Sequence, residues 1–369
     1  MPSPALSPQV QCSSGSRRHM PPELHANLAV LLAAVAALVL ALILGPPTMS
    51  RSLLLVAAGA GFAGMVLIAV APNLEIVILV ILALGILHAG AGGRRDFAVR
   101  LRGPVVAAAL VGLALFFAHV QGPQVLNRFA AVGLVAGLTA GVGLLPYIHE
   151  LDAEEPAVLS PIAWIGFVGP VLATAVVLRA RELLPVDAGG TFGAMLIGLG
   201  LLNVAWGSLA SWWTESGPAA WHYSFMADWG LVLCGFGLEV ADGQSAALIV
   251  LLSILLGRLP LYIASRQALV EKKPTERPIN LVVAAVLAGS APFAGFAARV
   301  LLFRAATEIY WPLALVLAAG MLLWLPGALR LGQSLGQPRG RQAFGVGLVV
   351  TLNVVIGLYP LPLLSLAGQ

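Results

Sequence analysis

The chain has 369 residues, of which 59% are hydrophobic and only 10% are charged, and its formal net charge is +4. An ordinary soluble domain carries about 25% charged residues, so this composition excludes a water-soluble protein of this size. The small and dispersed positive charge also excludes the basic groove of a nucleic-acid-binding protein. We therefore expect a hydrocarbon environment, which requires about 20 apolar residues for each helical crossing.

Taken from the N-terminus, the chain opens on a polar stretch. We expect residues 1–26 to form a disordered tail and residues 27–369 to form a single transmembrane domain. The first apolar run is too long for the apolar part of a signal peptide and lacks a clear cleavage site, so we interpret it as a membrane helix. The apolar segments are 27–45, 53–71, 74–92, 104–120, 129–147, 160–178, 191–213, 222–240, 245–265, 279–303, 309–328 and 343–366.

These segments predict an all-α fold, a polytopic transmembrane helix bundle of about 12 spans. A soluble helical protein would need a charged face on each helix, and these segments have almost none. A transmembrane β-barrel would show short strands of alternating polarity, which these runs do not show. Helices satisfy every backbone polar group internally, as the hydrocarbon core of a bilayer requires.

Basic residues between the segments predict the orientation in the membrane. With twelve crossings, most lysines and arginines fall on one side, including those of residues 94–102 and 272–277. The positive-inside rule places this richer side in the cytoplasm, whereas the pair Arg17-Arg18 argues for the opposite orientation. We expect an integral protein of the bacterial inner (cytoplasmic) membrane, with both termini in the periplasm.

Four ionisable side chains lie within apolar segments: His88, Asp228, Arg258 and Arg299. Such groups are costly inside a membrane, so each requires a partner or a function. Asp228 and Arg258 lie at similar depths on neighbouring antiparallel segments, which predicts a buried ion pair. The pair could pin two helices together, or it could belong to a proton or ion pathway in which arginine tunes the carboxylate. His88 is either a core histidine or a further member of that pathway.

Two segments contain residues that interrupt a helix. Gly169 and Pro170 lie in the interruption of the sixth segment, and Pro292 and Gly295 lie in that of the tenth. Proline removes a helical hydrogen bond, so we expect two broken helices. Broken helices in corresponding halves of a transporter indicate inverted repeats with an ion site at mid-membrane. A packing kink in each helix is the alternative.

Motifs for other chemistry are missing from the sequence. Residues 59–64 (GAGFAG) match a dinucleotide-binding pattern by letter, but they lie within an apolar segment without a preceding strand. We interpret these small residues as contacts for close helix packing. Metal-ligand spacing and nucleophile motifs do not occur either, so we expect no cofactor, no metal ion and no catalytic centre in this chain.

The tenth segment also carries a family resemblance. Residues 288–303 (AGSAPFAGFAARVLLF) resemble the AGxPPFAGFxxKxxxF signature of the antiporter-like membrane subunits. This family of proton-conducting subunits occurs in respiratory complex I, in membrane-bound hydrogenases and in Mrp sodium/proton antiporters. Further similar segments come in the family's order, so that the resemblance covers residues 145–366. They are 145–179, with DAEEP at 152–156 and Ser160, then 223–230, 246–263 and GLYP at 357–360.

The resemblance implies a chain of ionisable residues at mid-membrane, and this sequence departs from it. The family's three lysines fall at Gly169, Arg258 and Arg299, and a family histidine falls at Asp228. A second family histidine falls at Ile254, and the early membrane glutamate has no evident counterpart. One aspartate and two arginines therefore remain of the implied pathway.

By resemblance, we expect a membrane subunit of a complex I-like or Mrp-like assembly that translocates protons or cations, coupled to redox chemistry in partner subunits. The assembly could be an NADH:quinone oxidoreductase-like translocase, with other membrane subunits and lipid as partners and no nucleic acid. Two alternatives stay open. The loss of the lysines could leave a non-conducting accessory subunit. A stand-alone secondary transporter would need a polar pocket, to which Asn203, Trp206, Trp212 and Trp213 could contribute.

Overall fold

The structure, a computed structural model, describes residues 22–45, 51–91, 96–120, 124–147, 160–271 and 277–366. The described part of the chain is helical and contains no strand. Nine of its helices are long and apolar enough to cross a membrane. The predicted all-α membrane bundle is therefore confirmed. Most of the predicted tail, residues 1–21, and the DAEEP segment at 152–156 lie outside the described residues.

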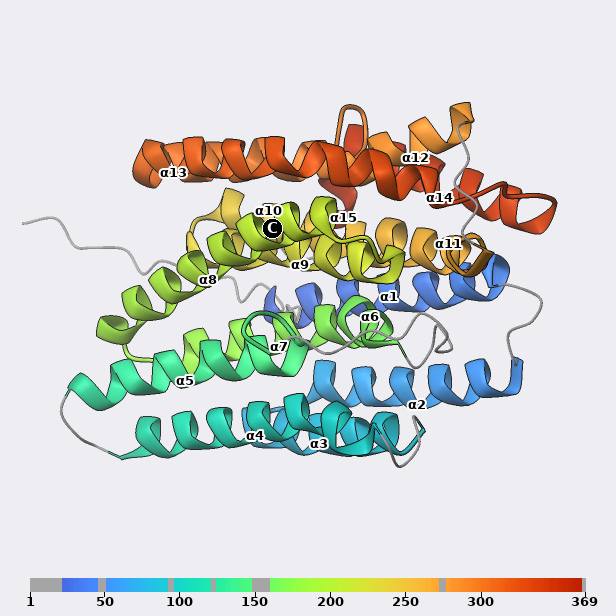
Figure 1. The fold of residues 1–369 in the computed structure, drawn as a ribbon. Coiled ribbons are helices and arrows are strands. Elements are labelled where there is room, and N and C mark those ends of the chain that lie inside the picture. Colours follow the sequence, from blue (N-terminus) through green and yellow to red (C-terminus); the bar gives the residue numbers. More distant parts are fainter. Residues whose placement is uncertain are drawn as a thin grey trace, which may run out of the picture.

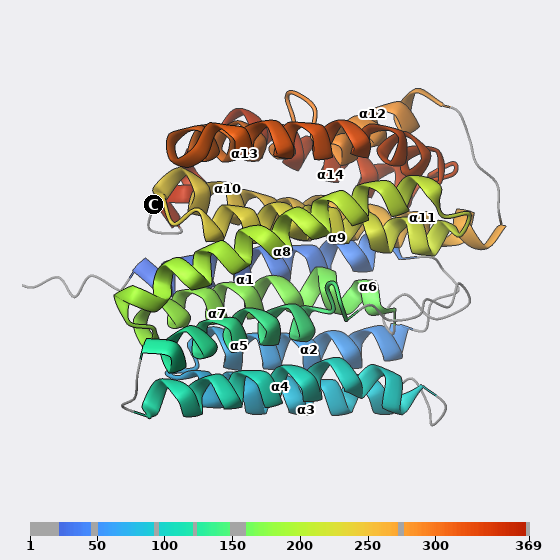
Figure 2. The same cartoon turned by 60° about the vertical axis from the view of Figure 1, so that its left-hand side comes forward.

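The first five helices are α1 (Pro22–Leu44), α2 (Arg51–Val70), α3 (Leu74–Ala91), α4 (Phe97–His119) and α5 (Gln124–Val142). Helices α2 to α5 build one side of the bundle, and α1 lies in its middle (Figure 1). In both views, α3 and α4 form one edge of the molecule, opposite the edge formed by α13 (Figure 1, Figure 2). Helix α1 begins before the predicted start at Asn27, and it packs against helices from both halves, including α2, α7, α11 and α14.

The middle of the chain supplies eight consecutive helical elements. They are α6 (Pro161–Ala163), η1 (Trp164–Val168), α7 (Gly169–Leu183), α8 (Val186–Trp213), α9 (Gly217–Gly237), α10 (Ala241–Ser253), η2 (Ile254–Arg258) and α11 (Leu259–Glu271). The elements η1 and η2 are single π-helical turns, each continuous with the α-helices on both sides. Two rods with a wide turn inside, α6–η1–α7 and α10–η2–α11, therefore run through the bundle.

The C-terminal helices are α12 (Pro278–Ala288), α13 (Ala294–Gln333), α14 (Arg341–Leu358) and α15 (Leu361–Leu366). Helix α13 is not straight, because Tyr310 has the non-helical angles φ −158° and ψ 96°. The Arg299 guanidinium lies 5.3 Å from the centroid of the Trp324 ring, whereas a straight helix would separate these residues by roughly 37 Å. The two arms of α13 therefore fold back on one another at Tyr310. With this hairpin, helical residues occupy each of the twelve predicted segments, and the tenth and the twelfth are each divided between two helices.

Helices α8 and α9 approach one another unusually closely. A Cβ atom added at Gly200 of α8 would lie 2.7 Å from the Gly230 carbonyl oxygen of α9. One added at Gly207 would lie 2.6 Å from the Ala227 backbone nitrogen. Only glycine permits such backbone contact between membrane helices. Because Gly230 is close in sequence to Asp228, helix α8 fixes the position of the helix that carries this acid.

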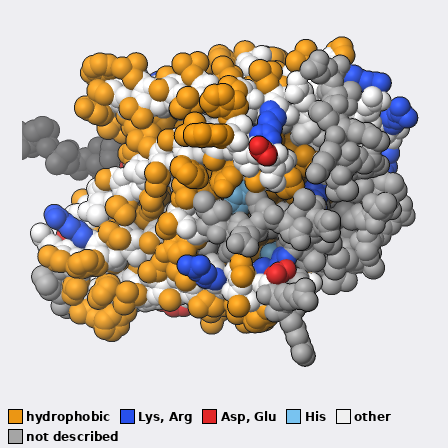
Figure 3. Space-filling model, viewed as in Figure 1, with side chains coloured by type: hydrophobic (Ala, Val, Ile, Leu, Met, Phe, Trp, Pro, Cys, Tyr) orange, Lys and Arg blue, Asp and Glu red, His pale blue; other side chains and the backbone are white. Residues whose placement is uncertain are grey.

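The outside of the bundle is apolar. Hydrophobic side chains cover most of the described surface in Figure 3, and only a few charged side chains interrupt them. Large apolar side chains that are more than half exposed occur along the bundle, among them Leu79, Phe116, Leu322 and Leu358. A water-soluble monomer rarely exposes apolar patches of this extent. The chain is an integral membrane protein.

Candidate functional site

A buried ion pair joins α9 to η2. The Nε atom of Arg258 forms an ion pair with Oδ2 of Asp228. The exposed fraction of the side chain is 5% for Arg258 and 14% for Asp228. The predicted pairing is confirmed, because two antiparallel helices place the residues at the same depth. A structural pin and a member of an ion pathway would both occupy this position.

Arg258 has further partners on two other elements. Its Nη1 atom donates a hydrogen bond to Ser224 Oγ, one helical turn before Asp228 on α9. Its Nη2 atom donates to the Leu287 carbonyl oxygen at 3.0 Å, near the end of α12. A guanidinium carries five N–H donors in a fixed plane and is effectively always charged. Arg258 therefore ties α9 and α12 to η2 through one permanently charged group.

Arg299 joins the same centre from the first arm of α13. Its guanidinium lies over the Trp324 ring, 5.3 Å from the ring centroid, and the Arg258 guanidinium lies 4.9 Å from the same centroid. The Trp324 side chain is fully buried. Both distances are within the range of a cation–π attraction, which is stronger when the groups are desolvated. Asp228, Arg258 and Arg299 are thus brought together, and Trp324 is a member that the sequence analysis missed.

The break between α12 and α13 balances part of the charge in this centre. Helix α12 ends at Ala288, and Gly289 adopts φ +62°, a left-handed conformation that glycine tolerates. The carbonyl oxygen of Leu287 accepts from Arg258, and that of Gly289 accepts from Arg299 at 3.5 Å. The C-terminal end of a helix carries partial negative charge. One carboxylate, one helix end and one indole face therefore stabilise two guanidinium groups.

The predicted break in the tenth segment is confirmed at this position. The residues between α12 and α13 are not helical, and they include Pro292. Gly295 comes next, in the first turn of α13, where a Cβ atom would lie 2.7 Å from Gly289 Cα. The chain therefore turns tightly at this point, and free carbonyl groups are left beside the arginines.

The predicted break at Gly169 and Pro170 takes a different form. The backbone stays helical through both residues, and η1 precedes them as a π-helical turn in which the Gly169 N–H donates to the Trp164 carbonyl oxygen. The turn η2 likewise ends two residues before Pro260. A proline ring clashes with the carbonyl group four residues earlier, and the wider turn relieves that clash. The turn η2 was not predicted from the sequence, although Pro260 was a signal for it.

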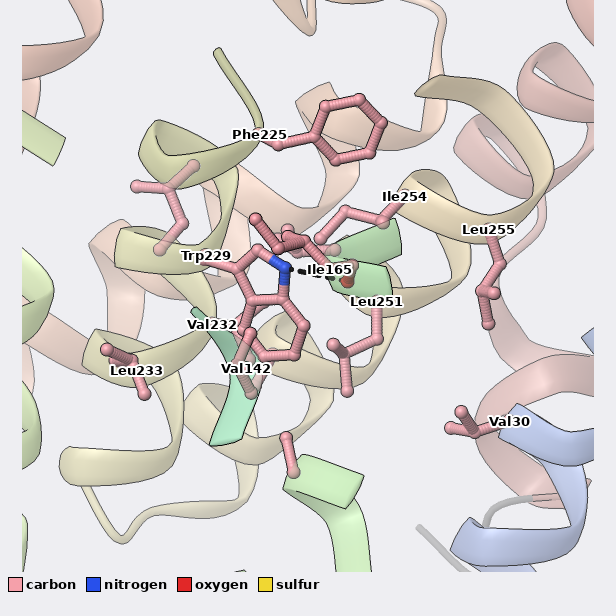
Figure 4. Packing of buried hydrophobic residues seen from close by; sticks show 14 of the residues in the cluster. Val30, Val142, Ile165, Phe225, Trp229, Val232, Leu233, Leu251, Ile254 and Leu255 are labelled. Atoms are coloured by element: carbon pink, nitrogen blue, oxygen red, sulfur yellow. Dashed lines mark hydrogen bonds between the residues drawn. The ribbon is translucent and has the colours of Figure 1, made fainter. Parts of the chain in front are cut away.

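The surroundings of Gly169 are apolar. A Cβ atom at this position would lie 2.9 Å from Cζ2 of Trp229 and 3.3 Å from Cγ1 of Val142. The Trp229 indole N–H donates to the Ile165 carbonyl oxygen at 3.2 Å, which holds the ring against η1 (Figure 4). Where the family resemblance places a lysine, this chain therefore has an indole packed against a glycine.

A second group of buried polar side chains continues along α11. Tyr262 and Arg266 come after Arg258 at intervals of four residues, so that all three share one face of the helix. The Tyr262 hydroxyl donates to Ser160 Oγ at 3.1 Å and accepts from Arg266 Nη1 at 3.3 Å. From Arg258 to Arg266 this column extends roughly 12 Å along the helix axis. This column was not predicted from the sequence, although the spacing of its polar residues in an apolar helix was a signal for it.

His88 lies among a different set of residues. Its ring centroid is 5.5 Å from that of Trp164. It lines a pocket between α3, α4, α5 and η1, together with Arg100, Pro104, Ala140, Gly141, Trp164 and Ile165. From this pocket, the contacts that lead towards α9 pass through Ile165 to Trp229. The structure therefore does not place His88 in the centre around Asp228.

The residues considered for a transporter pocket do not converge. Asn203 is fully buried and hydrogen-bonds to backbone groups of Leu199 and Leu145. The side chains of Trp206, Trp212 and Trp213 are largely exposed at the surface of α8. In the described part of the chain these four residues therefore form no common polar site.

The sequence is similar to that of a curated protein. It is 26% identical over 314 residues to the NADH-quinone oxidoreductase subunit N of Ectopseudomonas mendocina (strain ymp), a match that covers 70% of this chain and 61% of that protein. The chain thus spans less than two thirds of the length of this relative. No protein-family profile matches the sequence.

The fold is similar to chains in three solved membrane complexes. For the Mrp complex from Dietzia sp. DQ12-45-1b the TM-score is 0.75 at 14% identity, covering 93% of this chain and 44% of that chain. For the archaeal membrane-bound sulfane sulfur reductase the TM-score is 0.69 at 19% identity, covering 92% and 64%. For respiratory complex I from Thermus thermophilus with bound NADH the TM-score is 0.66 at 14% identity, covering 94% and 84%. These TM-scores establish a common fold.

Proposed function

We propose that this chain is a divergent antiporter-like membrane subunit of a complex I-like or Mrp-like assembly, and that it translocates protons or cations. Redox chemistry in partner subunits drives the movement, and this chain supplies no redox centre. Its partners are other membrane subunits of the assembly. It lies in the bacterial inner membrane, with the arginine-rich side in the cytoplasm and both termini in the periplasm.

The observation that carries this proposal is the buried carboxylate of Asp228 beside an interrupted helix. A buried ionisable residue with a named partner is a functional-site hypothesis in any membrane protein. Arg258 does not release its proton, so Asp228 is the member of the pair that exchanges a proton or binds a cation. When the ion pair opens, Arg258 keeps Ser224, the Leu287 carbonyl and the Trp324 ring as partners.

The polar column on α11 supplies a route from this centre towards the arginine-rich side. Tyr262 and Ser160 carry hydroxyl groups, which both donate and accept hydrogen bonds, and Arg266 lies beyond them. The column and the ion pair share helix α10–η2–α11, and Tyr262 comes four residues after Arg258. In this proposal, Asp228 exchanges with the cytoplasmic side along these groups.

The test is Asp228→Asn in the complete assembly, reconstituted into proteoliposomes. Asparagine keeps the shape and removes the charge, and we expect ion translocation per assembled complex to fall by roughly a hundredfold, as for a lost proton-transfer group. The matched control is Asp242→Asn, which removes the carboxylate that pairs with Arg304 at 2.9 Å outside the centre. The control should translocate normally. If Asp228→Asn and Arg258→Ala complexes both translocate at the wild-type rate, the proposal is wrong.

A second candidate function is favoured by the packing at Gly169. With Trp229 filling this position, a pathway between the two halves of the chain lacks one of its members. A non-conducting accessory subunit, which shapes or extends the assembly, needs no such pathway. Under this candidate, Asp228→Asn lowers the yield of assembled complex and leaves translocation per complex unchanged. The same experiment therefore separates the two functions.

A further inference from the structure

One indole ring contacts both arginines of the ion centre. The guanidinium groups of Arg258 and Arg299 come from two different elements, and both lie within 5.3 Å of the Trp324 ring centroid. The Trp324 Nε1 atom has no hydrogen-bond partner among the described residues, although the side chain is fully buried. Trp324 therefore acts on its neighbours through the face of the ring and not through its N–H group.

Arg299 is held less firmly than Arg258. Apart from Trp324, it contacts the Gly289 carbonyl through a hydrogen bond of 3.5 Å, which is at the long limit of such bonds. Arg258 has Asp228, Ser224 and the Leu287 carbonyl. Asp228 is one carboxylate beside two cations, so an arginine that leaves the ring competes for it. Apart from its attraction to Asp228, Arg299 is therefore held by the indole and by the Gly289 carbonyl.

We propose that Trp324 is a positioning residue of the ion centre, whose ring retains Arg299 and thereby reserves Asp228 for Arg258. The planar guanidinium is the cation suited to this arrangement, because it stacks on an aromatic face while its edge donates hydrogen bonds. The inference uses the proposed function only for its transport readout, since the pairing of Asp228 can be measured independently. The contact of Trp324 with Arg299 depends on the hairpin at Tyr310, which brings the second arm of α13 against the first.

The pairing of Asp228 is measured by infrared spectroscopy of the purified complex, as the carboxylate band that disappears in Asp228→Asn. Trp324→Phe keeps a ring face, so its band and its pH profile of translocation should match the wild type. Trp324→Leu removes the ring face and should shift the band, change the pH profile and lower translocation at least about tenfold. Adding Arg299→Gln to Trp324→Leu removes the competing cation and should restore the band.

Several outcomes overturn the inference. An unshifted band in Trp324→Leu means that the ring does not decide the partner of Asp228. A band that stays shifted in the double variant means that Trp324 acts as packing alone. If the Trp324→Leu complex does not assemble, Arg299→Gln alone is the test. The carboxylate band of Arg299→Gln should equal that of the wild type. A shifted band would show that Arg299 already pairs with Asp228. A complex in which no variant alters translocation refutes the proposed function and leaves the infrared result standing.

Discussion

The two π-helical turns of this chain have the same backbone and opposite side-chain chemistry. Each ends two residues before a proline, and each lies inside a continuous buried rod. At η1 the next residue is Gly169, which is covered by the Trp229 indole. At η2 the last residue is Arg258, which holds a carboxylate, a helix end and an aromatic ring. A π-helical turn alone therefore does not form an ion site. The side chains that face the turn determine whether such a site forms.

The difference extends to the burial of the two rods. In the apolar span of the rod that contains η2, 94% of the residues are buried, compared with 72% in the rod that contains η1. Deep burial makes an unpaired charge costly, and it also strengthens the interactions of a paired one. The polar centre is thus located where the protein can exclude both water and lipid.

The largest effect that tests this comparison is expected for Arg258→Ala. It would leave Asp228 buried without its partner, and the removal of one member of a buried pair costs about 3–5 kcal/mol. We expect a strongly lowered unfolding temperature of the purified complex in detergent. The control is Arg304→Ala, whose side chain is 74% exposed and which should cost at most about 1 kcal/mol. Equal unfolding temperatures for the two variants would contradict the special status of η2.

A smaller effect is expected for Gly169→Lys, which restores the residue that the family resemblance places at η1. The new side chain collides with the Trp229 ring, and overpacking of this kind costs about 1–3 kcal/mol. Burial of its ammonium group in apolar surroundings adds to this cost. Thermal unfolding and the yield of assembled complex measure the effect. Combining it with Trp229→Ala should recover part of the loss, because the side chain then has room. No recovery in the double variant would mean that the indole is not the group that closes this position.

The smallest effect is expected for Tyr262→Phe, which removes only the hydroxyl group that Ser160 and Arg266 contact. A lost hydrogen bond of this kind costs about 1 kcal/mol in stability. If the polar column serves the ion centre, translocation should fall more than stability does. Phe225→Leu, which alters the apolar packing on the Tyr262 ring, is the control for packing alone. A normal translocation rate in Tyr262→Phe would remove the column from the proposed pathway.

The fold and the ion pair could both be predicted from the positions of apolar segments, prolines and charged residues along the sequence. The apolar segments and the break near Pro292 are consequences of composition and of the chemistry of proline. The pairing of Asp228 with Arg258 results from their equal depth on neighbouring antiparallel segments. Both are properties of position along the membrane normal, which a sequence records directly.

The remainder of the site depends on how helices face one another. The contact of Arg299 with Trp324 exists because α13 folds back at Tyr310, two residues before Pro312. A proline indicates a break, but it does not reveal which side chains the two arms bring together. The position of Arg258 on its helix depends on η2, which adds a residue to one turn and rotates the rest of the helix. His88 lies at a suitable depth, but Trp164 and Ile165 lie beside it, and neither belongs to the centre around Asp228. Depth in a segment does not reveal these rotations.

The glycine contacts between α8 and α9 assign unequal mobility to the two members of the ion pair. The backbones of α8 and α9 are in contact at Gly200 and Gly207. Helix α9, which carries the carboxylate, therefore cannot slide or rotate against α8. Arg258 extends on a long side chain from a widened turn and keeps Ser224, the Leu287 carbonyl and Trp324 as partners. Any opening of the pair therefore comes from rotation of side chains, and not from movement of the helix that carries Asp228.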